Sequence, residues 1–152
     1  MINQQDHQKE VQMNKKKQNI DVHKKYQFRR TLGKGASCRV VEAIDKEDKE
    51  SKLAIKIMSK EKAICTTLYK HEVDILGRIE HENIVRFIDG TEDDSNYYVL
   101  TGLCEGGELF DRIVNPEYKI TEKIAAGLIR DMLESIKYLH EQNIVHRDLK
   151  PE

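Results

Sequence analysis

Hydrophobic and polar positions alternate along much of the chain in the way that is typical of β-strands. The alternation over residues 26–32 predicts one strand, and the pattern over 39–44 predicts a second. A largely apolar run over 53–58 predicts a third strand, which contains a single lysine. Two more apolar runs, 84–88 and 96–100, are joined by a polar turn and predict a hairpin. The pattern therefore predicts a five-stranded sheet.

Helical spacing of apolar residues replaces this alternation in three segments. Residues 62–79 carry an apolar stripe that predicts one helix after the third strand. A short helix is expected over 108–114, after a pair of glycines that breaks the pattern. The clearest helix is predicted over 121–139, with Thr121 as its N-cap. The expected fold class is therefore α+β, with one helix on the sheet and a helical segment after it.

The first 24 residues have a different character from the rest of the chain. They are rich in Gln, Asn, Lys and His and contain few large apolar side chains. Such a segment cannot bury enough surface to offset the entropy of ordering, so residues 1–24 are predicted to be a disordered tail. The run of lysines at 15–17 is interpreted as part of a solvated tail rather than as a membrane or targeting patch.

Composition narrows the functional classes. The chain has 152 residues, 38% hydrophobic and 35% charged, with a net charge of −1, which favours one soluble domain over a nucleic-acid-binding protein. No apolar run is long enough to span a bilayer. The three cysteines, at 38, 65 and 104, form neither a disulfide framework nor a metal-binding pattern, and no metal ligands are predicted. A reducing compartment is expected, the cytoplasm or alternatively the nucleus.

The first candidate motif is a glycine turn over residues 32–40, Leu-Gly-Lys-Gly-Ala-Ser-Cys-Arg-Val. Glycines at such a turn allow backbone N–H groups to approach phosphate oxygens closely. A plain hairpin turn is the alternative, and Cys38 stands where a third glycine is expected. The strands predicted on both sides argue against a dinucleotide-binding fold or a Walker P-loop, because those glycines lead into a helix.

The second candidate is Lys56, inside the apolar strand over 53–58. A buried ammonium is costly without a partner, so Lys56 either reaches solvent from an edge strand or pairs with a carboxylate near a phosphate. Glu72 on the following helix is the predicted partner. Asp74 lies about 200° further round that helix and is expected to point elsewhere.

The third motif, over residues 146–152, reads His-Arg-Asp-Leu-Lys-Pro-Glu and follows the longest predicted helix. Asp148 is suited to accept a hydroxyl proton, and Lys150 is suited to neutralise charge on a transferred phosphoryl group. The alternative is a charged loop that merely ends a helix, which a string of seven such residues makes improbable.

Together these motifs resemble the signature of eukaryotic Ser/Thr protein kinases over residues 26–152. The segment 106–113 is similar to the calcium/calmodulin-dependent and calcium-dependent kinases in particular. The resemblance implies a kinase N-lobe over 25–101 with a five-stranded antiparallel sheet and one helix, a hinge over 102–105, and the start of a truncated helical C-lobe over 106–152. The matching positions are Gly33, Gly35, Lys56, Glu72, the segment 81–85, the segment 106–113 and the loop 146–152.

The resemblance also implies roles for individual residues. The ATP site is expected to comprise Leu32, Gly33, Lys34, Gly35, Cys38, Val40, Ala54, Lys56, Thr101, Gly102, Cys104 and Glu108. The catalytic residues are expected to be Lys56, Glu72, Asp148 and Lys150. Thr101 would be the gatekeeper, and Gly102 stands where an acidic residue is common. An internal spine would be formed by Leu76, Phe87 and His146.

The predicted function is ATP-dependent transfer of the γ-phosphoryl group to a Ser or Thr hydroxyl of a protein substrate. Mg²⁺ is the expected second cofactor, with its ligands beyond residue 152, so residues 1–152 alone are predicted to be inactive and poorly soluble. The alternative is a truncated, inactive kinase-like module that binds partners through its exposed last helix. Control by calcium or calmodulin is expected only through regions outside this chain.

Overall fold

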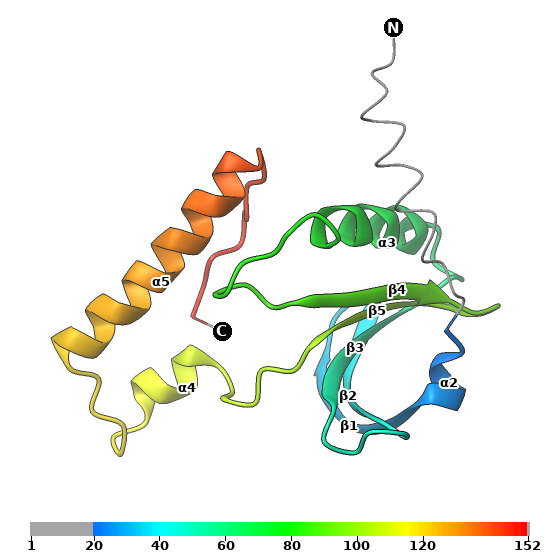
Figure 1. Cartoon of the computed structure of the whole chain (residues 1–152), viewed down its shortest axis with the longest axis horizontal. Helices are drawn as coiled ribbons and strands as arrows, with labels where there is room; N and C mark the ends of the chain where they lie inside the picture. The colour runs from blue at the N-terminus through cyan, green and yellow to red at the C-terminus, as the bar shows by residue number, and fades with distance from the viewer. Residues whose placement is uncertain (1–19, 152) are drawn as a thin grey trace, which may run out of the picture.

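The computed structural model describes residues 20–151 and contains one antiparallel sheet of five strands in the order β1-β2-β3-β5-β4 (Figure 1). Three helices flank or follow the sheet, with a single turn of helix before it. In chain order the elements are α2 (Val22–Lys25), β1 (Tyr26–Lys34), β2 (Cys38–Asp45), β3 (Lys52–Ser59), α3 (Ala63–Leu76), β4 (Phe87–Glu92), β5 (Asn96–Gly102), α4 (Leu109–Val114) and α5 (Glu122–Glu141). The predicted α+β fold class is confirmed.

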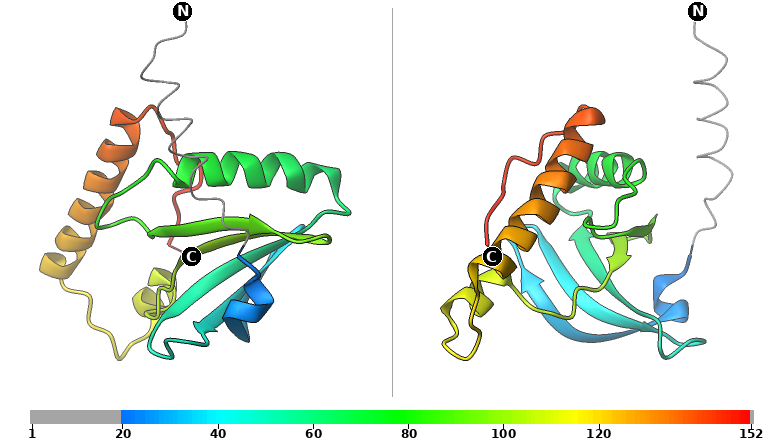
Figure 2. Two further views of the ribbon diagram at one scale, coloured as in Figure 1. Left: turned by 45° about the vertical axis from the view of Figure 1, so that its right-hand side comes forward. Right: turned by 60° about the vertical axis from the view of Figure 1, so that its left-hand side comes forward.

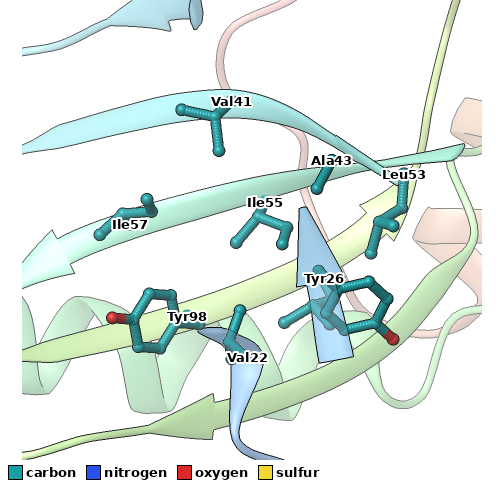
Figure 3. Close-up of a cluster of buried hydrophobic side chains, with 9 residues drawn as sticks. Val22, Tyr26, Val41, Ala43, Leu53, Ile55, Ile57 and Tyr98 are labelled. Atoms are coloured by element: carbon teal, nitrogen blue, oxygen red, sulfur yellow. The ribbon is translucent and has the colours of Figure 1, made fainter. Parts of the chain in front are cut away.

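The central strand β3 has two different faces, because successive side chains point to opposite sides of a sheet. Leu53, Ile55 and Ile57 lie on one face and are at most 9% exposed. They form a core with Tyr98 and Leu100 of β5, with residues of β1 and β2, and with α2 (Figure 3). The other face carries Ala54, Lys56 and Met58, and α3 packs against part of it. We call the face with Leu53, Ile55 and Ile57 the sealed face, because its side chains are buried. We call the face with Ala54, Lys56 and Met58 the shared face, because α3 covers only part of it.

The short helix α2 closes the sealed face. Its N-cap Asp21 accepts a hydrogen bond from the backbone N–H of Lys24 at 3.0 Å, and Val22 is 3% exposed. Most of the predicted disordered tail, residues 1–19, lies outside the described residues. Residues 22–24, which the predicted tail includes, form part of α2, because the single apolar side chain of Val22 is buried against the sheet.

Helix α3 covers one end of the shared face. Its Cys65 is fully buried with Met58, Tyr97 and Val99, and the Tyr69 ring stacks on Tyr97 at 4.5 Å between centroids. The helix ends at Leu76, three residues before the predicted end. The next residues continue only as a tighter turn, with N–H groups bonded to carbonyls three residues back.

The connection from α3 to β4, residues 77–86, contacts α5. The Tyr138 hydroxyl of α5 accepts a hydrogen bond from the backbone N–H of Glu80 at 2.9 Å, and its ring packs on His81 at 5.1 Å. The Asn83 side chain donates to the carbonyl of Asp131 at 3.4 Å. Figure 2 shows α5 standing apart from the sheet, so this connection carries much of the contact between the two parts.

The predicted strand over 84–88 is wrong in its position. The observed strand, β4, begins at Phe87, and Ile84 and Val85 instead line a hollow shared with Met132 of α5. These two apolar residues face the hollow beside α5 and do not pair in the sheet. The apolar run therefore led to a predicted strand that starts too early.

Helix α5 matches its prediction closely, and both of its ends are capped. The Thr121 hydroxyl accepts a hydrogen bond from the N–H of Ile124 at 3.3 Å. At the other end Asn143 has a positive φ of 59°, and the N–H groups of Asn143 and Ile144 bond to the carbonyls of His140 and Leu139. This Schellman motif turns the chain sharply. The segment that follows therefore runs back toward α4 (Figure 1). No helix within residues 20–151 combines the length and the apolar character needed to cross a bilayer.

The close packing of α3 on β4 gives a stability prediction. A Cβ added at Gly90 would lie 2.6 Å from Cγ2 of Val73. Gly90→Ala should therefore lower the free energy of unfolding by about 1–3 kcal/mol, measured by urea denaturation. Gly127 lies within α5, and a Cβ there would meet no atom within 4 Å. Gly127→Ala is the control and should raise stability by about 0.5–1 kcal/mol. Equal destabilisation by both substitutions would contradict this account.

Candidate active site

An ion pair joins β3 to α3 at the centre of the shared face. The Lys56 ammonium donates to both carboxylate oxygens of Glu72, at 2.7 Å and 2.9 Å. The two side chains are 33% and 27% exposed, so the pair is partly buried but open to solvent on one side. Asp74 points away and bonds to Arg78 at 2.9 Å. The contact expected between Lys56 and Glu72 is therefore present, and Lys56 does not project from an edge strand.

The sheet beside the pair offers an apolar surface that α3 does not cover. Val40 pairs with Lys56 across β2 and β3, and Ala54 pairs with Thr101 across β3 and β5. Val40, Ala54 and Thr101 are each partly exposed, and Leu32 near the end of β1 is 40% exposed. This surface is suited to bind a flat apolar ligand next to the positive charge of Lys56.

The glycine turn lies next to this apolar surface. It begins two residues later in the sequence than predicted. Gly33 and Lys34 continue β1, paired with Val40 and Arg39, and the turn begins at Gly35. The Gly35 N–H bonds to the carbonyl of Cys38 at 2.9 Å, and a Cβ on Gly35 would lie 3.1 Å from the Cys38 sulfur. Gly35 is therefore needed for close packing within the turn. Gly33 has no such neighbour, and its surroundings are open.

A hollow of about 380 Å³ is bordered by the glycine turn, β3 and α3. Lys56 and Glu72 line it from below, and Ser37 and Cys38 line it from the turn. Backbone groups of a turn and an ammonium that share one hollow form a suitable environment for an anion. The remaining lining residues are Met58, Leu68, His71, Ile75 and Leu76.

A backbone bond at the end of β5 and an ion pair in the segment after it fix the start of this segment. The N–H of Gly102 bonds to the carbonyl of Arg86 at 2.9 Å. Lys52 of β3 bonds to Glu105 at 2.8 Å, and this bond raises the pKa of Lys52 and lowers the pKa of Glu105. An added Cβ at Gly102 would approach no atom closer than 3.9 Å, so glycine is not required there by packing.

Cys104 and Glu108, two further residues of the predicted nucleotide site, are exposed. Glu108 directly precedes α4, in the N-cap position, and its side chain makes no capping bond. Both residues are therefore accessible from solvent. The pair formed by Lys52 and Glu105 was not predicted, because two exposed charges far apart in sequence give no signal of contact.

The loop after α5 places Asp148 and Lys150 at the surface, both exposed. Arg147 has a positive φ of 68°, which is unusual for a residue other than glycine and is often found at functional sites. The N–H of Asp148 bonds to Nδ1 of His146 at 3.3 Å, and the Pro151 carbonyl accepts a bond from the N–H of Phe110 in α4 at 3.0 Å. The end of the loop is thus tied to α4, and a local bond orders its middle.

The predicted site residues fall into two groups. One group surrounds Lys56 and Glu72, and the other lies on the loop with Asp148 and Lys150. Within residues 20–151 no hydrogen bond or ion pair joins the two groups. A hollow of about 490 Å³ lies between them, with Leu76, Thr101, His146 and Leu149 among its lining residues.

The predicted spine is only partly assembled. Leu76 lines a hollow with His146 and a second hollow with Phe87. Leu76 therefore stands between the other two residues, but the stack of three remains a prediction.

The residues present fit a nucleoside triphosphate. Lys56 offers a partly exposed positive charge, the glycine turn offers backbone N–H groups, and the surface around Ala54 is apolar. Within residues 20–151 no group of three or more Asp, Glu, His or Cys side chains is arranged to hold a metal ion.

The different environments of Glu72 and Asp74 give a matched pair of variants. Glu72→Gln removes a carboxylate from a partly buried ammonium and should cost about 1–3 kcal/mol of stability, between the values for exposed and buried pairs. Asp74→Asn removes an exposed pair between the same helix and the turn that follows it, and should cost less than about 0.5 kcal/mol. Urea denaturation of both variants checks the difference. Equal losses in the free energy of unfolding would mean that the pair between Lys56 and Glu72 contributes no more than an exposed pair.

Comparison with known proteins agrees with this geometry. The protein kinase domain family matches residues 26–152. The chain is 45% identical over 129 residues to calcium/calmodulin-dependent protein kinase cmkA of Emericella nidulans, covering 84% of this chain and 30% of that protein. It is 44% identical over 133 residues to calcium/calmodulin-dependent protein kinase type 1 of Macrobrachium nipponense, covering 86% and 38%.

A calcium/calmodulin-dependent protein kinase type 1 of Caenorhabditis elegans is 39% identical over 136 residues, covering 88% of this chain and 38% of that protein. The chain thus spans about a third of the length of the curated relatives that it matches. The paired lysine and glutamate, the glycine turn and the His-Arg-Asp loop occur here in one fold and in the expected order, and the chain belongs to the protein kinase domain family.

Proposed function

We propose that this chain supplies the ATP-binding lobe and the catalytic loop of a Ser/Thr protein kinase. The observation that carries the proposal is the ion pair between Lys56 and Glu72 beneath the glycine turn. A partly exposed ammonium that is held by two carboxylate oxygens has a fixed position and still faces the hollow. Such a group binds and orients phosphates, and phosphoryl transfer depends chiefly on positioning and charge neutralisation.

The apolar surface beside the pair accounts for the other half of the ligand. Val40, Ala54 and Leu32 accept the flat face of an adenine ring, and Thr101 limits the depth of the pocket. Backbone groups at Gly102 and Cys104 face the edge of the ring, and Glu108 faces the ribose or a basic substrate residue. Gly33, Lys34, Gly35 and Cys38 form the cover over the phosphates.

The catalytic loop supplies the groups that act on the protein substrate. Asp148 orients the Ser or Thr hydroxyl and accepts its proton, and Lys150 neutralises charge on the phosphoryl group. Bound ATP with Mg²⁺ supplies that phosphoryl group and part of the charge neutralisation. No metal ligand is assigned within residues 20–151.

The names of the relatives support a finer proposal. The complete protein is proposed to respond to calcium and calmodulin through regions outside this chain, because each of the three relatives is named a calcium/calmodulin-dependent kinase. A reducing location, cytoplasmic or nuclear, is proposed on the basis of the three cysteines, which are all free.

One observation favours a second candidate, an inactive kinase-like interaction module. Ile129 and Leu133 of α5 are 53% and 59% exposed, so this helix presents an apolar surface. The first candidate is preferred because an interaction module has no chemical need for Lys56, Glu72, Asp148 and Lys150 together.

The test is phosphoryl transfer from labelled ATP to a Ser/Thr peptide library by the protein made from the complete coding sequence. Transfer should require Mg²⁺, and Asp148→Asn should lower kcat by about 10²–10⁴ fold, the usual contribution of a positioned acid–base group. Asp94→Asn, an exposed site in the turn between β4 and β5, is the matched control and should leave kcat unchanged.

Activity should also be compared with and without calcium-loaded calmodulin. An inactive wild-type protein that still binds partners through α5 would favour the module. Transfer that survives Asp148→Asn would contradict the role given to that residue.

A further inference from the structure

The tip of the glycine turn rests against the first turn of α3. The Lys62 ammonium donates to the carbonyl of Ala36 at 2.6 Å. The Cys65 thiol lies 3.7 Å from the carbonyl of Ser37, within reach of a weak hydrogen bond from sulfur. Two successive carbonyls of the turn are thus contacted by two side chains one helical turn apart.

Lys62 occupies a position where a lysine is unfavourable for the helix itself. It is the N-cap of α3, where Ser, Thr, Asp or Asn would satisfy a free N–H, and its side chain makes no capping bond. Its positive charge also lies at the positive end of the helix dipole, and the first turn contains no acidic residue to compensate. Departures from local rules of this kind mark positions retained for a contact elsewhere. The contact seen here is the carbonyl of Ala36.

Cys65 gives the second, independent half of the same attachment. It is fully buried, and its cluster includes Met58, with Cys38 at the base of the turn packed against it. The turn therefore contacts α3 in two ways, through packing at Cys38 and through the hydrogen bond from Lys62. The hollow lined by Lys56 and Glu72 is also lined by Ser37 and Cys38 of the same turn.

We propose that Lys62, supported by Cys65, is a positioning residue that fastens the glycine turn to α3. One helix then fixes two parts of the nucleotide site, the ammonium of Lys56 through Glu72 and the backbone of the turn through Lys62. The consequence for ATP rests on the proposed kinase function. The attachment itself does not, because it concerns only the order of the turn.

The first measurement is hydrogen–deuterium exchange in the protein made from the complete coding sequence. Lys62→Met keeps the length of the side chain and removes the donor, so peptides that contain residues 35–38 should exchange about threefold to tenfold faster, as expected for one hydrogen bond. Lys62→Arg keeps a donor and should restore slow exchange. Lys60→Met is the control, because Lys60 lies two residues away and bonds to Glu92 instead.

The second measurement separates positioning from stability. Lys62→Met should raise the KM for ATP by about threefold to tenfold with kcat within about twofold, because binding is weakened equally in ground state and transition state. Its Tm should stay unchanged or rise, since a charge that opposes the helix dipole is removed. A purely structural role would lower Tm instead.

The outcomes distinguish the two proposals. Unchanged exchange over residues 35–38 in Lys62→Met, or an equal change in Lys60→Met, would overturn the attachment whether or not the protein is active. Faster exchange with an unchanged KM would overturn its role in nucleotide binding. A wild-type protein without phosphoryl transfer would overturn the proposed function, and exchange would still decide the attachment.

Discussion

The structure depends on one charge placed within an apolar strand. Lys56 lies in β3 between Ile55 and Ile57, whose side chains are buried on the opposite face. An ammonium at such a position needs an opposite charge, and Glu72 is the group that meets this need. The pair therefore fixes the rotation of α3 on the sheet as well as the direction of Lys56. Because α3 is held at this position, it leaves one side of the ion pair and part of the sheet uncovered.

Features that are determined locally could be predicted from the sequence. The helix over 121–139 has a capping threonine and regular apolar spacing, and it is observed as α5 over Glu122–Glu141. The contact between Lys56 and Glu72 was also predictable, because a lysine in an apolar strand requires a carboxylate and helical geometry excludes Asp74. The helix is specified by residues within one element, and the ion pair is required by a single charge in an apolar strand.

Features that depend on distant neighbours could not be predicted. Ile84 and Val85 have the composition of a strand, but they line a hollow together with residues of α5, which lies far along the chain. Val22 is a single apolar residue in a polar stretch, and only the assembled sheet provides its site. Lys62 gives no signal of its own in the sequence, because its partner is a backbone carbonyl in a turn whose position was itself predicted two residues too early.

The hydrogen bonds from Glu80 to Tyr138 and from Asn83 to Asp131 anchor the chain just beyond the C-terminal end of α3 to α5. The opposite end, which begins at Ala63, has no comparable anchor on α5 among the described residues. Fourteen residues give α3 a length of about 21 Å, so a pivot of about 10° at its anchored end would displace the first turn by roughly 3–4 Å. The glycine turn contacts the end of α3 that is furthest from this anchor, so such a pivot would displace the turn more than the other end of the helix.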